Sequence, residues 1–406
     1  MSRSVRARVD PWLLTLCGSR TFMTLVFQAY AATLPVLRET WDMSATAAGS
    51  ISMGFQLGYA VSLLFFSWLA DRVSARRVYL WSAWLSAVAA LAFALLARSY
   101  VSGLSLYTLV ALSQGGTYTT AIMLIADRYP PQRRGAAVGW LLGSSSLGYA
   151  LSLLVAGVAV RAGGYPLAFI ATASGPVIGL GLGWLALRSS RNVVHPRASG
   201  AGFGSEVLHN RPAMRLMMGY TFHSWELLGM WAWTPAFVAA AVAVGGVAGV
   251  GAVSRGAYIS AAFHVMGLIA GSTMGRLSDR LGRRILLLTL AAASTVCSFV
   301  FGWLIGWPAG VLFLVGAVYG FTALGDSPVL STAFTEAVSP AYLGSALALR
   351  SLFGFGAGAL APLAFGAVLD LTNPPGVTPT VWGWSFVTLG LGGVAATWCA
   401  WGLSRK

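Results

Sequence analysis

The chain has 406 residues, of which 57% are hydrophobic, 12% aromatic and only 9% charged, and its mean hydropathy is +0.74. Soluble domains carry about 25% charged residues, so this composition excludes a soluble enzyme of two or three domains. The formal net charge of +15 would be typical of a nucleic-acid-binding protein if the chain were soluble, so the distribution of that charge matters.

Long apolar stretches follow one another along the whole chain. They cover residues 12–37, 45–67, 78–97, 102–126, 135–160, 166–187, 213–241, 254–275, 285–304, 309–335, 343–369 and 380–403. Each is long enough for a transmembrane helix, which needs about 20 apolar residues. A membrane-spanning barrel would need alternating segments of about 10 residues, which the chain lacks. We therefore predict an all-α polytopic membrane protein with twelve transmembrane helices.

The cationic residues lie mostly on one side of this predicted topology. With both termini in the cytoplasm, 20 of the 26 Lys and Arg residues fall in cytoplasmic segments. Because positive residues are concentrated on the cytoplasmic side, this asymmetry places both termini there. The charge therefore indicates orientation, and we expect no nucleic-acid partner. Lys406 is the only lysine, which we interpret as the codon bias of a GC-rich bacterial genome, and we expect the bacterial inner membrane.

Short patterns of the first half recur in the second half. The run Leu69-Ala-Asp71-Arg72 recurs as Leu277-Ser-Asp279-Arg280, and Asp127 after the fourth stretch recurs as Glu336 after the tenth. We predict two pseudo-symmetric six-helix bundles, residues 1–187 and 213–406, joined by a cytoplasmic linker, residues 188–212. Parallel repeats of this kind place the solute site near the membrane midplane, between the halves.

The segment Gly275-Arg-Leu-Ser-Asp279-Arg280-Leu-Gly282-Arg283-Arg284 resembles a loop signature of the major facilitator superfamily, G-x-x-x-D-R/K-x-G-R/K-R/K. The first copy departs from it, because Ser67 and Ser74 replace both glycines and Ala75 is an extra residue. The resemblance implies a secondary transporter that works by alternating access of two helical bundles. It also implies that spans 1, 4, 7 and 10 line a central cavity.

The signature places carboxylates beside arginines at helix ends on the cytoplasmic side. Carboxylate–guanidinium pairs can form and break there, and we predict that they gate this side. A plainer interpretation is a positive anchor with a tight turn. The predicted gating residues are Asp71, Arg72, Arg76, Asp279, Arg280 and Arg283.

Four ionisable residues lie inside predicted spans, where charge is costly and usually functional: Arg20, Glu226, Asp326 and Arg350. Glu226 with His223 is the best candidate for proton coupling, because a carboxyl shielded from water exchanges protons near neutral pH. Arg20 is a candidate anchor for an anion. Static ion pairs of Glu226 with Arg20, and of Asp326 with Arg350, are the structural alternatives.

Polar residues recur at helical spacing on spans 1, 4, 7 and 10, so each helix can direct one polar stripe inward. In span 7 the stripe is Tyr220, His223 and Glu226, and Trp225 adds aromatic surface. The predicted residues for binding solute or protons are Arg20, Gln28, Gln114, Tyr118, His223, Trp225, Glu226, Asp326 and Arg350.

These residues predict a proton-coupled symporter of a small polar or anionic solute. Export of amphipathic, drug-like compounds is an alternative, although residues 135–160 contain no proline and so lack the Gly-Pro motif of drug/proton antiporters. Copper transport through Met230, His264 and Met266 is a further alternative, since thioethers and imidazoles suit copper. We find no nucleophile elbow, Walker loop or zinc motif, and expect neither enzymatic activity nor a cofactor. A monomer in the lipid bilayer is expected.

Overall fold

The structure is a computed structural model that describes residues 10–190, 207–339, 343–374 and 380–403. The described residues form helices and no β-strand. The helices are α1 (Pro11–Met23), the short 3₁₀ helix η1 (Thr24–Val26), α2 (Ala29–Thr40), α3 (Ala45–Ala70), α4 (Ala75–Leu96), α5 (Tyr100–Arg128), α6 (Pro131–Leu187), α7 (Arg211–Val244), α8 (Val250–Leu281), α9 (Arg283–Phe301), α10 (Ala309–Ala337), α11 (Leu343–Thr372) and α12 (Gly383–Trp401).

Short polar side chains mark the beginnings of several helices. Asp10, Ser44 and Asn210 each accept a hydrogen bond from a backbone amide in the first turn of α1, α3 and α7, at 2.9, 3.1 and 3.1 Å. The first amides of a helix have no partner within it, and such caps supply one. The predicted apolar stretches therefore begin a few residues after their caps.

Two of the helical paths are interrupted. The first span consists of α1, η1 and α2, and the hydroxyl of Thr24 at the break donates to the carbonyl of Arg20 at 3.1 Å. The long α6 has non-helical backbone angles at Gly163 and Gly164, and Gly164 has a φ of 69°, which glycine adopts without a side-chain clash. These two glycines separate the predicted spans 135–160 and 166–187. Taken this way, the described helices are consistent with twelve crossings.

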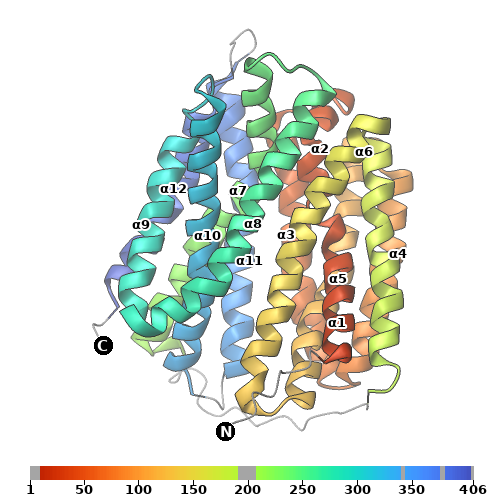
Figure 1. Cartoon of the computed structure of the whole chain (residues 1–406), viewed down its shortest axis with the longest axis vertical. Coiled ribbons are helices and arrows are strands. Elements are labelled where there is room, and N and C mark those ends of the chain that lie inside the picture. The colour runs from red at the N-terminus through yellow and green to blue at the C-terminus, as the bar shows by residue number, and fades with distance from the viewer. Residues whose placement is uncertain (1–9, 191–206, 340–342, 375–379, 404–406) are drawn as a thin grey trace, which may run out of the picture.

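The helices form two side-by-side bundles, α1–α6 and α7–α12, as Figure 1 shows by its red-to-yellow and green-to-blue halves. Across the division, α3 lies along α11 and α6 lies along α8. The predicted fold of two six-helix bundles is confirmed. The greater part of the predicted linker, residues 191–206, lies outside the described residues, and the domain boundaries stay a prediction.

The two bundles share apolar packing at one end only. We call the end where α1 begins the proximal end, and the opposite end, where α3 begins, the distal end. At the proximal end each bundle has its own cluster, one around Leu16 and Tyr79 and the other around Leu287 and Phe334. Towards the distal end two clusters contain residues of both bundles. The larger includes Leu37, Ile51, Phe237, Phe365 and Trp382, and the smaller includes Leu153 and Ala257. The bundles are therefore joined more closely at the distal end.

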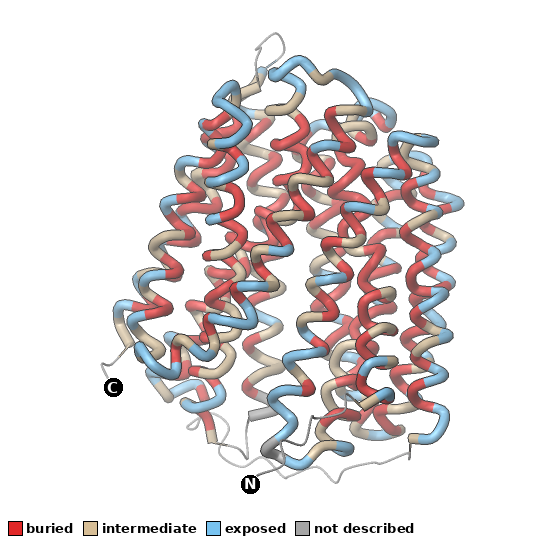
Figure 2. Tube along the Cα trace, in the orientation of Figure 1, coloured by how far each residue is buried: buried red, intermediate tan, exposed pale blue. Residues whose placement is uncertain are grey.

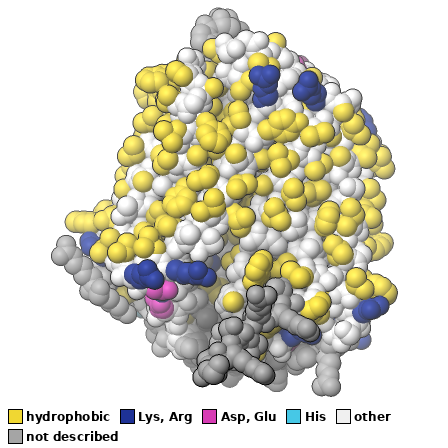
Figure 3. Space-filling view, in the orientation of Figure 1, with side chains coloured by type: hydrophobic (Ala, Val, Ile, Leu, Met, Phe, Trp, Pro, Cys, Tyr) yellow, Lys and Arg dark blue, Asp and Glu magenta, His cyan; other side chains and the backbone are white. Residues whose placement is uncertain are grey.

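The outer surface is apolar, and buried residues line the helix faces turned inward (Figure 2). On the face drawn in Figure 3, hydrophobic side chains cover the middle and arginines lie towards the two ends. Nine of the described helices are long and apolar enough to cross a bilayer. An apolar belt of this kind identifies a multi-pass membrane protein, because it would be unstable in water.

Candidate functional site

Arg20 on α1 is the most deeply buried cation among the residues that the structure describes, with 1% of its surface exposed. Its Nε donates to Ser145 Oγ at 2.8 Å, and its terminal nitrogens donate to Thr117 Oγ1 at 3.2 Å and to the Tyr59 hydroxyl at 3.4 Å. The guanidinium also lies over the Tyr118 ring, 5.0 Å from its centre. All these partners are neutral. Their helices, α3, α5 and α6, belong to the first bundle, and no anionic side chain of the described residues contacts this positive charge.

Arg350 on α11 is the corresponding cation of the second bundle, 8% exposed. It lies over the Tyr220 ring, 4.2 Å from the centre, and one terminal nitrogen donates to Ser331 Oγ at 3.2 Å. Its Nε has no hydrogen-bond partner among the described residues. Tyr118 lies close enough to both Arg20 and Arg350 to interact electrostatically with each. We call the two arginines and the tyrosines around them the basic site.

Aromatic contacts cross the division beside this basic site. The rings of Tyr59 on α3 and Phe355 on α11 are 5.5 Å apart. The ring of Tyr149 on α6 lies 5.1 Å from Trp231 and 6.1 Å from His264. The sequence prediction missed Tyr59 and Tyr149, because neither stands on the four helices expected to line the cavity.

The predicted glutamines are buried in the first bundle, whereas Trp225 on α7 is only partly buried. Gln114 is fully buried, and its amide donates to the carbonyl of Met23 at 3.1 Å, while Gln28 is 4% exposed at the break between η1 and α2. The indole of Trp225 donates to the carbonyl of Thr388 on α12 at 3.0 Å. Trp225 therefore faces α12 and takes no part in the basic site.

The acidic residues form a second polar cluster inside the second bundle. Glu226 is 3% exposed and accepts hydrogen bonds at 2.6 Å from both Ser294 and Ser298 on α9. His223 on α7 faces α10. Its Nδ1 lies 3.0 Å from Asp326 Oδ1, and its Nε2 lies 2.8 Å from Ser327 Oγ. The imidazole thus joins a carboxylate to a hydroxyl, an arrangement that can pass a proton between them.

Neither of the two static ion pairs considered from the sequence is present among the described residues. Arg20 contacts hydroxyls and Glu226 contacts serines of α9, so they do not pair. Asp326 pairs with His223, whereas Arg350 lies on Tyr220. The prediction that Tyr220 and Glu226 share one inward-facing stripe on span 7 is also wrong. Tyr220 faces the basic site, whereas Glu226 faces α9.

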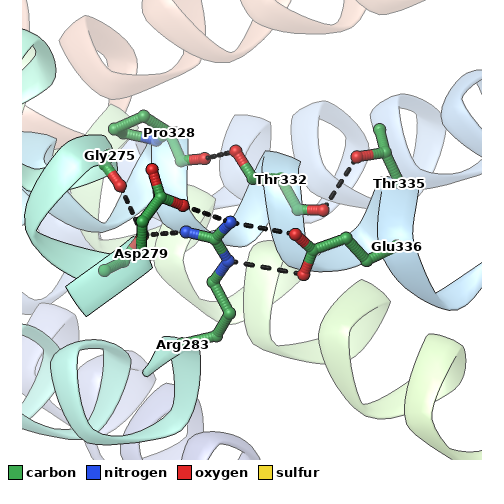
Figure 4. A network of polar contacts seen from close by, with 8 residues as sticks. Gly275, Asp279, Arg283, Pro328, Thr332, Thr335 and Glu336 are labelled. Atoms are coloured by element: carbon green, nitrogen blue, oxygen red, sulfur yellow. Dashed lines mark hydrogen bonds and ion pairs between the residues drawn. The ribbon is translucent and has the colours of Figure 1, made fainter. Parts of the chain in front are cut away.

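The second copy of the signature forms a network at the proximal end (Figure 4). Arg283 binds Asp279 at 2.6 Å and Glu336 at 2.9 Å, and it also donates to Ser278. These partners lie on α8 and α10, so the network fastens the α8–α9 turn to the end of α10 within one bundle. Arg280 stands in the last turn of α8.

The first copy of the signature is arranged differently. Arg76 donates to the carbonyl of Leu187 at 2.8 Å, and Arg72 lies over the Trp68 ring, 3.9 Å from its centre. Asp71 is the residue that ends α3. Among the described residues, no ion pair joins the two bundles at the proximal end.

The distal end holds a polar contact that the sequence prediction missed. Asp370, near the end of α11, accepts hydrogen bonds from the amides of Ala45 and Thr46 at 2.8 and 2.7 Å and from the Thr46 hydroxyl at 2.6 Å. The carboxylate of one bundle thus covers the beginning of α3 in the other. Nearby, the hydroxyl of Ser254 on α8 donates to the carbonyl of Gly157 on α6 at 2.8 Å. These contacts hold the two bundles together at the distal end, and we call the contact of Asp370 with Ala45 and Thr46 the distal latch.

The residues proposed for copper are only partly together. Met230 and His264 line one cavity in the second bundle, but Met266 is not among its lining residues. The described residues contain no group of three or more His, Cys, Asp or Glu side chains that could hold a metal ion.

Two bundles of membrane-spanning helices around a buried basic site define the class as a polytopic membrane protein built from two helical bundles. A model of the Major Facilitator Superfamily matches residues 16–255, more than half of the chain, and the protein belongs to this family.

Curated relatives match parts of the chain. The uncharacterized transporter YgaY of Escherichia coli O157:H7 is 27% identical over 57% of this chain, and the match spans 59% of its own length. A gentisate transporter of Corynebacterium glutamicum is 28% identical over 36% of this chain and 33% of its own length. A hexuronate transporter of Bacillus subtilis is 26% identical over 35% of this chain and 33% of its own length.

Solved structures match the whole fold. The nucleoside transporter NupG has a TM-score of 0.73 at 14% identity, covering 97% of this chain and 100% of its own. A D-xylose-proton symporter has a TM-score of 0.75 at 16% identity, covering 97% of this chain and 98% of its own. At such identities these similarities concern the fold alone.

Proposed function

We propose that this protein transports a small organic anion, whose carboxylate binds between Arg20 and Arg350. The observation that carries the proposal is the burial of Arg20 among neutral hydroxyls, where no carboxylate of the described segments pairs with it. An unpaired charge away from water costs on the order of several kcal/mol, which an anionic substrate would offset. The unpartnered Nε of Arg350 supplies a further donor. The names of two relatives, for gentisate and hexuronate, both denote carboxylates that carry hydroxyl groups.

The acidic cluster is the proposed site of proton coupling. Glu226 and His223 both lie on α7, and the His223 ring is close to Tyr220 of the basic site. Glu226 accepts hydrogen bonds from two serines of α9, and His223 pairs with Asp326 of α10. A proton taken up here would offset the negative charge that enters with the anion, so anion and proton would move together. The fold is shared with a D-xylose-proton symporter, which is consistent with this coupling.

The orientation follows from charge, and we propose that the proximal end faces the cytoplasm of a bacterial inner membrane. Both termini and the linker, residues 188–212, would then be cytoplasmic. In this orientation the distal latch would close the external side, as expected of an inward-facing state. Asp71, Arg72, Arg76, Asp279, Arg280 and Arg283 are proposed to form the cytoplasmic gate when the carrier turns outward.

Uptake into proteoliposomes tests the proposal. Radiolabelled gentisate and glucuronate are offered at an inward-directed proton gradient, with Arg20→Gln and Arg20→Lys as variants and the exposed Arg161→Gln as the matched control. Removing one partner of a buried charge pair costs about 2–5 kcal/mol, so binding should weaken by at least about 30-fold in Arg20→Gln. Arg20→Lys should retain part of the affinity. Equal uptake by Arg20→Gln and Arg161→Gln would refute the proposal.

A further inference from the structure

The second bundle contains a cavity beside the basic site. Residues of α7, α8 and α10 line this cavity, together with Phe301 of α9. The lining residues that matter here are Trp231, Thr234, Ser260, Phe263, His264 and Tyr319. None of the residues lining this cavity is Asp, Glu, Lys or Arg.

Three polar atoms of the lining have no hydrogen-bond partner among the described residues: Trp231 Nε1, Thr234 Oγ1 and Ser260 Oγ. Thr234 is 6% exposed and Ser260 2% exposed, so the surrounding lipid and solvent do not supply one. Buried polar groups are nearly always hydrogen-bonded, and leaving one unpaired is costly. The concentration of three such atoms in one cavity therefore points to a ligand that binds them.

The hydroxyls of Thr234 and Ser260 also make no hydrogen bond to a backbone carbonyl of their own helices. A buried Ser or Thr in a helix commonly donates to the carbonyl one turn earlier. Thr221 on α7 and Thr295 on α9 do so, at 2.9 and 2.7 Å. Thr234 and Ser260 make no such bond. Their donors are thus available inside the cavity.

His264 adds an imidazole to the same wall. It is 7% exposed, its ring lies 5.4 Å from Trp231, and no hydrogen bond to it is found in the described part of the chain. Tyr149 of the opposite bundle lies against both rings. Tyr149 follows Ser145, the partner of Arg20, by four residues on α6, so the two share one helix face. The cavity and Arg20 therefore lie on either side of Tyr149.

We propose that this cavity is a subsite for the uncharged, hydroxylated end of the transported anion. The inference rests on the proposed function, in which the carboxylate of the same molecule binds between Arg20 and Arg350. The subsite takes a neutral group, because its lining has no charge to pair with an ionised one. Trp231 offers a donor only, whereas Thr234, Ser260 and His264 donate and accept, which suits ligand hydroxyls. The cavity has a volume of about 20 Å³, so it admits a hydroxyl group of the ligand and not its ring.

Binding of matched acids to the purified full-length protein tests the subsite. Each pair holds the carboxylate constant and varies the hydroxyls: gentisate with benzoate, and glucuronate with cyclohexanecarboxylate. Dissociation constants are measured by isothermal titration for the natural protein, Ser260→Ala, Thr234→Val and the control Ser272→Ala. Ser272 stands on the same helix as Ser260 but is exposed and bonds to its own helix.

We expect at least one hydroxylated acid to bind about tenfold or more tightly than its partner, since a site built for hydroxyls disfavours the analogue that lacks them. Ser260→Ala and Thr234→Val should each reduce that preference by about three- to tenfold and leave the bare acid unchanged. Ser272→Ala should alter neither. The thermal stability of each variant without ligand, measured in parallel, identifies any loss of folding.

The outcomes separate the subsite from the proposed function. If the bare acids bind and depend on Arg20, but hydroxyls add no affinity, the subsite is refuted and the anion transporter stands. The subsite is equally refuted if Ser260→Ala and Thr234→Val weaken both members of a pair alike. If none of the four acids binds, the proposed function fails and the subsite fails with it.

Discussion

The contact of Asp370 with the beginning of α3 should determine how readily the distal end opens. The carboxylate receives two backbone amides and one hydroxyl from the other bundle. A negative charge at a helix N-terminus contributes up to about 2 kcal/mol in partly buried geometries. Asp370→Asn removes the charge and keeps one acceptor oxygen, so we expect it to destabilise the latched state by about 1–2 kcal/mol. That is roughly a 5- to 30-fold change in the ratio of latched to open molecules.

Spin labels on two exposed distal residues, introduced as Thr40→Cys and Leu371→Cys, report this ratio as a distance distribution. Asp370→Asn should increase the longer-distance population, and Thr46→Val, which removes one of three donors, should increase it less. Asp42→Asn is the matched control, because Asp42 is an exposed carboxylate at the same end. A distribution for Asp370→Asn that coincides with that of Asp42→Asn would show that the latch does not hold the distal end.

Four further outcomes follow from the structure. Glu226→Gln should abolish proton-driven accumulation while leaving counterflow exchange of the anion, and unchanged dependence of uptake on the pH gradient would contradict the coupling role. Arg283→Gln breaks the contacts with Asp279 and Glu336, which are partly exposed, so it should lower the thermal stability by less than about 1 kcal/mol but change the proportion of outward-facing molecules. Burial raises the pKa of Asp10, but hydrogen bonds from Tyr129, the Trp12 amide and Arg128 outweigh it and hold that pKa below its usual range. Asp10→Asn should therefore lower the free energy of unfolding at neutral pH. The difference between the two proteins should disappear as the pH falls below about 4, where the Asp10 carboxylate becomes protonated. A side chain at Gly148 would meet Thr24 and the carbonyl of Thr21, so Gly148→Leu should separate α6 from α1 and reduce expression of folded protein, whereas Gly139→Leu, which has open space, should not.

The sequence predicts the helices and the family far better than it predicts the contacts of the buried charges. Apolar length and the second copy of the signature are sufficient for the fold, because lipid requires helices of a minimum length. The position of Arg20 inside a span was also predicted, since a cation in a span is exceptional. Its neutral partners come from three other helices, and no local pattern indicates them.

The stripe predicted on span 7 failed for a geometric reason. A step of three residues turns a helix of 3.6 residues per turn by about 300°, so two such steps leave Glu226 about 120° away from Tyr220. Tyr220 therefore meets Arg350 while Glu226 meets α9. The latch was missed because Asp370 and Thr46 are 324 residues apart in the chain, and a single sequence carries no signal for that pairing.

The division of the two arginines between the bundles has an energetic consequence for the transport cycle. Under the proposed function, Arg20 would move with the first bundle and Arg350 with the second, so closing the carrier without an anion would bring two like charges together in a medium of low dielectric constant. A carboxylate between them would offset that repulsion, so a carrier loaded with anion and proton would close more readily than one loaded with a proton alone. Cycles that carry a proton without the anion would then be slow.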